Sequence, residues 1–315
     1  MKKDLISIII PCYNEAESLP VTFDALQDAA QSLPAAEFEY ILVDDGSTDD
    51  TCGVMKALAE ANSRVRFLSF SRNFGKEAAM LAGMTHSAGD YVCIMDADLQ
   101  DSPKLLPQMH EAVTREGFDC AAVRRVTRAG EPKLRSFFAR RFYGLMTKLC
   151  KIDIVAGARD FRLMTRQMTD AVLSLKETSR YSKGIFSWVG FKTKWIDCEN
   201  IRRTKGVSKW SFLDLLLYAN DAVISFSTLP LALSSVLGLL LCAIAFIAII
   251  VVIVRQLTWG GSAYGWSSLV CIILFLFGIQ LFCTGILGQY LAKTFDEAKK
   301  RPLYIIKEAG GGNGE

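Results

Sequence analysis

Two aspartates, Asp96 and Asp98, stand one residue apart directly after a short apolar segment, residues 91–95. Because alternate residues at the end of a strand point the same way, the two carboxylates are expected to lie side by side. Two carboxylates this close are not both ionised comfortably unless a cation lies between them. A hard divalent cation, Mg²⁺ or Mn²⁺, which prefers oxygen ligands and also holds a diphosphate, is the cofactor that this pair predicts.

The alternative interpretation of this pair is a solvated turn between a strand and a helix. It is disfavoured because a second acidic pair, Asp44-Asp45, ends another predicted strand. Gln100, two residues beyond Asp98, is interpreted equally as a neutral oxygen ligand of the metal or as a residue at the start of the next helix.

Four short apolar segments end in polar residues of the kinds that bind ligands, and they alternate with segments of helical spacing. The apolar segments are residues 5–10, 38–43, 65–70 and 91–95, and the helical ones are residues 17–33, 50–61 and 75–87, with a further helix start at Ser102-Pro103. This alternation predicts an α/β fold with a parallel sheet covered on both faces. Ligands bind such sheets at the carboxyl ends of the strands, so the polar residues are predicted to form one site.

The sequence contains neither a glycine-rich dinucleotide fingerprint after its first strand nor a phosphate loop, which disfavours dinucleotide oxidoreductases and P-loop enzymes. Its nine cysteines are scattered, as in free thiols of a reducing compartment, and its two histidines make a zinc site of the His/Cys type unexpected. The net charge of +3 is too close to balance to indicate a nucleic-acid partner.

The chain of 315 residues is 51% hydrophobic, and no charged side chain occurs in residues 222–254 or 256–292. A water-soluble front part and a membrane-embedded back part are therefore predicted, with spans at residues 231–254 and 266–291. A buried hairpin of core helices is the alternative. The flanks of the two spans carry more Lys and Arg than their connection, which predicts that both termini are cytoplasmic.

A basic stretch at residues 124–141 includes apolar residues between its arginines. A solvated helix face and a nucleic-acid arm are possible interpretations, but the mixture favours an amphipathic helix at a membrane surface.

Seven motifs at characteristic spacing give the chain a resemblance to a known family. They are PCYNE at 11–15, VDDGS at 43–47, SRNFGKE at 71–77, MDADLQ at 95–100, RDFRLM at 159–164, RTKGVSKW at 203–210 and RPLY at 301–304. In this order they resemble family 2 glycosyltransferases of the polyprenyl-phosphate sugar synthase branch, which includes bactoprenol glucosyltransferases and dolichol-phosphate mannose synthases. The resemblance spans nearly the whole chain, and the two-helix form is most similar to the bactoprenol glucosyltransferases.

The resemblance implies a Rossmann-like nucleotide-sugar-binding domain of the glycosyltransferase A type, followed by two C-terminal transmembrane helices. The expected organisation is a cytoplasmic transferase domain at 1–210, an interfacial segment at 211–228, two transmembrane helices within 229–292 and a cytoplasmic tail at 293–315. The glycine-rich end of this tail, residues 310–314, is expected to be disordered. The implied location is the bacterial cytoplasmic membrane, with tetramers as the oligomeric form seen in related two-helix enzymes.

The implied activity is inverting transfer of a hexose, with glucose from UDP-glucose as the leading donor, onto undecaprenyl phosphate. Transfer of mannose from GDP-mannose or of an aminosugar is the alternative. A processive polysaccharide synthase is disfavoured because its Gln-x-x-Arg-Trp motif does not occur in the sequence. A non-catalytic membrane scaffold would need neither the paired aspartates nor Asp160.

Carried over by position, the resemblance also assigns individual roles. The donor nucleotide sugar is assigned to Pro11, Tyr13, Asn14, Glu15, Val43, Asp45, Lys76, Asp96, Ala97, Asp98, Arg203 and Lys209. The metal is assigned to Asp96, Asp98 and Gln100, and the lipid phosphate to Arg125, Arg128, Arg135 and Arg140. From the residues alone, Val43 is a core residue, and Arg203 and Lys209 would equally suit a membrane-surface patch.

Asp160 corresponds to the carboxylate that the family uses as its catalytic base. A lipid monophosphate has a second pKa of about 6, so it is largely ionised at neutral pH and strong proton abstraction is not obligatory. Orienting the acceptor, binding the sugar and a purely structural pairing with arginine therefore stay open as roles of Asp160. One departure from the family is Lys183, which stands where relatives usually carry arginine.

Overall fold

The computed structural model describes residues 3–125, 155, 157–198, 224, 227–259 and 265–312. The chain divides into two compact units. The first contains Met1–Ser211 and Arg301–Glu315, and the second contains Phe212–Lys300.

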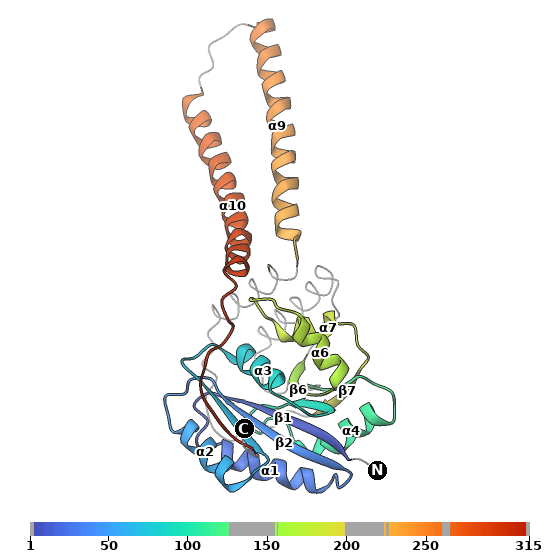
Figure 1. Cartoon of the computed structure of the whole chain (residues 1–315). Coiled ribbons are helices and arrows are strands. Elements are labelled where there is room, and N and C mark those ends of the chain that lie inside the picture. The colour runs from blue at the N-terminus through green and yellow to red at the C-terminus, as the bar shows by residue number, and fades with distance from the viewer. Residues whose placement is uncertain are drawn as a thin grey trace. The chain divides into compact units, whose positions relative to one another are not determined.

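Four parallel strands form the centre of the first unit (Figure 1). They are β1 (Asp4–Cys12), β2 (Ala36–Asp44), β3 (Val65–Phe70) and β4 (Tyr91–Ile94), arranged in the order β3-β2-β1-β4. The four strands predicted from the apolar segments are therefore confirmed. Their side chains are buried on both faces, as the neighbouring residues Ile8, Ile9 and Ile10 show, because helices cover both faces of the sheet.

The helices that follow these strands pack on opposite faces of the sheet. Three of them contribute to one core with Ile6, Ile8 and Ile10, namely α1 (Leu19–Gln31), α2 (Thr51–Ala61) and α4 (Leu106–Thr114), the last preceded by a 3-10 turn, η1 (Pro103–Leu105). The remaining one, α3 (Lys76–Thr85), packs its Gly83 closely on Ile9, which points to the other face. This alternation brings the carboxyl ends of β1, β2 and β4 next to the start of α3.

The rest of the sheet is mixed, whereas the alternation of strands and helices predicted a parallel sheet. It contains β5 (Cys120–Arg125), β6 (Ala158–Thr165), β7 (Thr193–Cys198) and β8 (Ile306–Gly311), in the full order β7-β5-β6-β4-β1-β2-β3-β8. β6 runs antiparallel to β4 and β5, and β8 runs antiparallel to β3. Two short helices, α6 (Arg166–Ser174) and α7 (Ser182–Trp188), follow β6.

The expected disorder of the glycine-rich end is wrong for the part that the structure describes. Gly310 pairs with Phe67 and Gly311 pairs with Arg66, so both belong to β8. A Cβ atom at Gly310 would lie 2.8 Å from the Phe67 ring, and one at Gly311 would lie 2.3 Å from the Val65 carbonyl oxygen. These glycines therefore permit close pairing of β8 with β3. The predicted tail 293–315 is divided accordingly, because its first residues belong to a helix and its later ones to the sheet.

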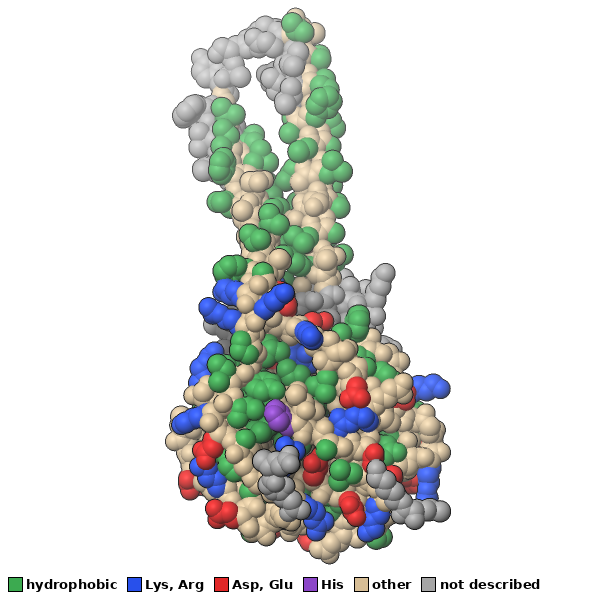
Figure 2. Space-filling model, in the orientation of Figure 1, with side chains coloured by type: hydrophobic (Ala, Val, Ile, Leu, Met, Phe, Trp, Pro, Cys, Tyr) green, Lys and Arg blue, Asp and Glu red, His purple; other side chains and the backbone are tan. Residues whose placement is uncertain are grey.

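The second unit contains two long helices, α9 (Leu229–Trp259) and α10 (Trp266–Lys299), at the places predicted for the spans (Figure 1). By length and composition alone, both are able to cross a membrane, with mean hydropathy of 2.6 over Leu229–Ala248 and 1.5 over Phe275–Lys299. Figure 2 shows hydrophobic side chains along the exposed surfaces of both helices. Nearly all of the predicted interfacial segment 211–228 lies outside the described residues.

Candidate active site

A cleft of about 340 Å³ opens at the carboxyl ends of the central strands. Of the residues predicted to bind the donor, it is lined by Pro11, Tyr13, Glu15, Asp45, Lys76, Asp96, Ala97 and Asp98. The sequence prediction did not include four further lining residues, Cys12, Asn73, Gly75 and Ala79. Asn73 and Gly75 lie inside the 71–77 motif, so the motif itself was the signal that could have found them.

Lys76 connects the paired aspartates to the predicted catalytic carboxylate. It is the first residue of α3, and its Nζ lies 2.5 Å from Oδ1 of Asp96, which stands two residues after the end of β4. The same ammonium group also contacts Asp160 Oδ2 on β6. The Lys76 side chain is 42% exposed in the cleft, whereas that of Asp160 is only 18% exposed. Three elements that are distant in the sequence therefore place two acids around one cation.

These contacts shift the proton affinities of the groups in the cleft. Burial acts to raise the pKa of Asp160, but Lys76 and then Lys183 outweigh it and hold this pKa at about 2. Burial acts to lower the pKa of Lys76, but Asp96 and Asp160 raise it above its usual value. Both groups are therefore charged at neutral pH, and the Asp160 carboxylate is a weak proton acceptor in this arrangement.

Asp45 lines the cleft and also holds the backbone that leads into α3. Its carboxylate accepts hydrogen bonds from the Phe74 N–H, at 2.7 Å, and from the Gly75 N–H, at 2.9 Å. Gly75 has a φ of +97°, a conformation that favours glycine. Burial raises the pKa of Asp45, although these two N–H groups oppose the shift. Asp45 is thus one cause of the position of Lys76.

Side chains behind Asp160 fix its strand and the neighbouring helix α7. Arg162 is buried, donates to the Arg159 carbonyl at 3.0 Å and lies over the Phe186 ring, 3.7 Å from its centroid. Glu77, next to Lys76 on α3, accepts hydrogen bonds from the backbone N–H and the hydroxyl of Ser182. Adjacent residues of α3 therefore bind Asp160 and the first residue of α7.

Two of the three predicted metal ligands line the cleft, and the third is hydrogen-bonded to an arginine. Asp96 and Asp98 both line the cleft, and the Lys76 ammonium beside Asp96 shows that this carboxylate accepts a cation. The amide oxygen of Gln100 instead accepts a hydrogen bond from Arg159 Nη2 at 2.8 Å. The described residues include no group of three or more His, Cys, Asp or Glu side chains arranged to hold a metal. Water and phosphate oxygens would supply further oxygen ligands to a cation at Asp96 and Asp98.

The structure does not bring every predicted residue to the cleft. Val43 is fully buried in β2, and Asn14 fastens one loop to the next by accepting a hydrogen bond from the Thr48 N–H at 2.8 Å. Arg125 ends β5, where its N–H donates to the Gly157 carbonyl at 2.9 Å. The other predicted phosphate ligands lie outside the described residues, namely Arg128, Arg135, Arg140, Arg203 and Lys209.

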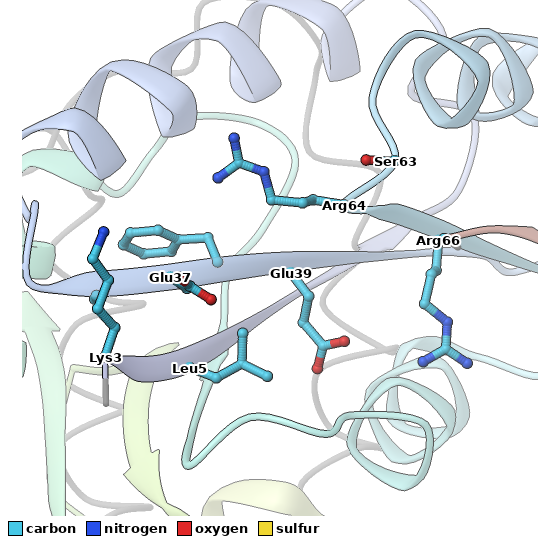
Figure 3. Close-up of a pocket in the computed structure, with 10 residues that line it drawn as sticks. Lys3, Leu5, Glu37, Glu39, Ser63, Arg64 and Arg66 are labelled. Atoms are coloured by element: carbon cyan, nitrogen blue, oxygen red, sulfur yellow. The ribbon is translucent and has the colours of Figure 1, made fainter. Parts of the chain in front are cut away.

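A larger cleft, of about 550 Å³, lies at the opposite edge of the sheet, where β1, β2 and β3 begin (Figure 3). Its charged side chains are of both signs and partly engaged within the protein. Glu39 accepts hydrogen bonds from the Ser7 hydroxyl and the Ala88 N–H, and Arg66 donates to the His86 carbonyl. The smaller cleft is the better candidate site, because it contains the acids and the lysine at the carboxyl edge of the sheet.

Lys76→Met is expected to lower kcat/KM for the donor of the reaction by about 10- to 100-fold, the size expected for lost hydrogen bonds to charged groups. Without the ammonium group, burial raises the pKa of Asp160, so this acid takes up a proton at a higher pH than in the wild type. The ratio of variant to wild-type activity should therefore fall as the pH is lowered from about 8 to about 5. Titration of the acceptor changes the rate of both proteins equally, so its effect cancels in this ratio.

The matched control for Lys76→Met is Lys56→Met, because Lys56 is also 42% exposed and paired, at 2.6 Å, with Glu308. This control should keep the wild-type activity at every pH. A ratio for Lys76→Met that does not change with pH would contradict the influence of Lys76 on Asp160.

Comparison with known proteins supplies the family of the chain. Residues 7–173 match the family model described as Glycosyl transferase family 2. CsbB of Bacillus subtilis (strain 168) is 42% identical over 309 residues, which cover 98% of this chain and 93% of that protein. The SfII prophage-derived bactoprenol glucosyl transferase of Shigella flexneri is 37% identical over 308 residues, covering 98% and 99%. A crystal structure of glucosyl-3-phosphoglycerate synthase from Mycobacterium tuberculosis with Mn²⁺, UDP and phosphoglyceric acid aligns with a TM-score of 0.46 at 18% identity, covering 70% of this chain and 76% of that one.

Proposed function

The chain belongs to glycosyl transferase family 2, and we propose that it transfers one hexose from a nucleoside-diphosphate sugar to a polyprenyl phosphate. The single observation that carries this proposal is the charge arrangement around Lys76, where Asp96 and Asp160 meet at a cleft that Asp98 also lines. Glucose is the leading sugar, because a relative that matches over 98% of this chain is named a bactoprenol glucosyl transferase. UDP-glucose is the donor that we propose for it.

In the proposed reaction, an oxygen of the acceptor phosphate attacks the anomeric carbon of the donor sugar. The bond from that carbon to the β-phosphate oxygen breaks, so the nucleoside diphosphate leaves and the configuration at the carbon is inverted. A divalent cation, Mg²⁺ or Mn²⁺, held by Asp96 and Asp98 would neutralise charge on the diphosphate. Lys76 offers a further positive charge at the same place, and such preorganised charges are a major source of rate acceleration.

Asp160 has a proposed role in orientation rather than in proton abstraction. Its pKa of about 2 makes it a far weaker base than the acceptor phosphate, whose second pKa is about 6. Its ionised carboxylate holds Lys76 at the cleft and supplies a fixed negative charge opposite the sugar, which gains positive charge as the bond breaks. Arg203 and Lys209 are proposed as further ligands of the donor phosphates.

The proposed location is the bacterial cytoplasmic membrane, with α9 and α10 as spans and both termini on the cytoplasmic side. Two uninterrupted apolar helices support this proposal, as does the excess of Lys and Arg at their flanks. Anchoring would confine the enzyme to the same plane as its lipid acceptor, which raises the frequency of productive encounters.

The experiment that tests this function uses the full chain in proteoliposomes with undecaprenyl phosphate and Mg²⁺. Labelled UDP-glucose, GDP-mannose and UDP-N-acetylglucosamine are supplied in separate reactions, and the lipid is then extracted. Label from UDP-glucose in a short, acid-labile lipid is the expected result. Label in a polymer would indicate a processive synthase, and transfer from none of the donors would contradict the proposed function.

A further inference from the structure

The segment that follows α10 packs onto the loop that leads into Lys76. Tyr304 lies between α10 and β8, in the RPLY motif, for which the proposed reaction gives no role. Its ring stacks on Phe70 at the end of β3, with centroids 5.2 Å apart and planes at 12°. The next residue, Ile305, accepts a hydrogen bond from the Ser71 N–H at 3.0 Å. The C-terminal segment thus contacts the chain where β3 ends and the loop begins.

This loop, residues 71–75 and called the donor loop below, is part of the cleft. Asn73 and Gly75 line the cleft, and Lys76 follows immediately as the first residue of α3. Phe70 contacts Phe74 edge-on, with centroids 5.8 Å apart. The three rings of Tyr304, Phe70 and Phe74 are therefore in continuous contact from the C-terminal segment into the donor loop.

The opposite side of the donor loop is held by the residues that follow β2. Asp45 accepts hydrogen bonds from the Phe74 and Gly75 N–H groups. Gly46, with a φ of +66°, lies so close that a Cβ atom there would be 2.4 Å from the carbonyl carbon of Arg72. The donor loop is thus fixed between Asp45-Gly46 on one side and the three aromatic rings on the other. Removing either support gives the backbone before Lys76 room to move.

We propose that Tyr304 is a positioning residue for the donor site, acting through Phe70 and Phe74 to hold the donor loop and, with it, Lys76. The expected effect on the donor KM rests on the proposed function. The expected effect on the mobility of the donor loop does not depend on any reaction. The segment between α10 and β8 would then be a component of the donor site, although it is far from the catalytic motifs in the sequence.

The test uses hydrogen–deuterium exchange of the full chain in detergent, comparing Tyr304→Ala with Tyr304→Phe. Tyr304→Ala should speed exchange of the Ser71, Phe74 and Gly75 amides by about tenfold, the size expected when one aromatic pair is lost. Tyr304→Phe keeps the ring and should exchange like the wild type. Glu308→Gln is the matched control on β8, because Glu308 pairs with Lys56 instead of contacting the donor loop.

The second readout is the affinity for UDP in the presence of Mg²⁺, together with separate KM values for donor and acceptor. Tyr304→Ala should weaken UDP binding and raise the donor KM by about tenfold, with the acceptor KM unchanged. If Tyr304→Ala does not fold, Tyr304→Leu keeps an apolar side chain there, smaller and without a flat ring, and should show a smaller shift in the same direction.

Unchanged exchange of the donor loop in both Tyr304→Ala and Tyr304→Leu would overturn the inference, as would an equal rise in donor and acceptor KM. Failure of the proposed function is a different result. It would appear as a wild-type chain that transfers no sugar, while the exchange of the donor loop still responds to Tyr304.

Discussion

Asp98→Asn should lower sugar transfer by about 10³-fold while leaving the chain folded. The substitution keeps the shape of the side chain but removes one of the two carboxylates proposed to hold the divalent cation. Losing a cation that neutralises a leaving diphosphate costs several kcal/mol of transition-state stabilisation, which corresponds to a rate loss of this size. Asp96 alone, with Lys76 already at 2.5 Å from its Oδ1, is a poor replacement for the pair.

The effect of Asp98→Asn can also be measured without turnover, as the change in UDP binding when a chelator is added. In the wild type, a chelator should weaken UDP binding, because the cation and the nucleotide are bound together. In Asp98→Asn the chelator should have little further effect, so that the two changes are not additive. Asp197→Asn is the control, because Asp197 is an exposed acid on β7 that pairs with Arg124 on β5. Retained transfer in Asp98→Asn would refute the metal assignment.

Asp160→Asn is expected to reduce kcat by about 10²- to 10³-fold, the range for loss of one preorganised electrostatic group at a reacting centre. UDP binding should change much less, because Lys76 would still have Asp96 as a partner. Steady-state kinetics with both substrates varied, together with UDP binding to the same preparation, measures the two effects separately.

The pH dependence of Asp160→Asn distinguishes the two roles of this acid. If Asp160 were a proton acceptor, the variant should recover activity above about pH 7, where the lipid phosphate has already lost its second proton. If Asp160 orients Lys76 and the substrates, the deficit should be the same from about pH 7 to about pH 9. The pKa of about 2 favours the second result, because so weak a base gains little by accepting a proton. Recovery at high pH would support the base.

The central sheet and the acidic pair could be predicted from the sequence because their signals are local. The apolar segments of β1 to β4 are short, rich in β-branched residues and ended by polar residues, and ligands bind at that edge of a parallel sheet. The expected fold class, a Rossmann-like domain of the glycosyltransferase A type with two apolar C-terminal helices, is confirmed. The family assignment is confirmed as well.

Contacts between distant segments were the part that could not be predicted. Nothing local in the glycines at 310–311 shows that they pair with β3, because the cause is the close approach of Phe67 and Val65. Nothing in the local sequence shows that the Gln100 oxygen accepts a hydrogen bond from Arg159, 59 residues away. The bridge between Asp96 and Asp160 likewise requires β6 to insert antiparallel beside β4.

The central claim is that the acids and the lysine of the cleft transfer one sugar to a lipid phosphate. The most direct test measures the nucleoside diphosphate released and the sugar-lipid formed in the same reaction, with polyprenyl phosphate and, separately, with polyprenol. We expect one nucleoside diphosphate for each sugar-lipid with polyprenyl phosphate, and neither product with polyprenol. Nucleoside diphosphate release that does not require the lipid phosphate, or several sugars on each lipid, would contradict the claim.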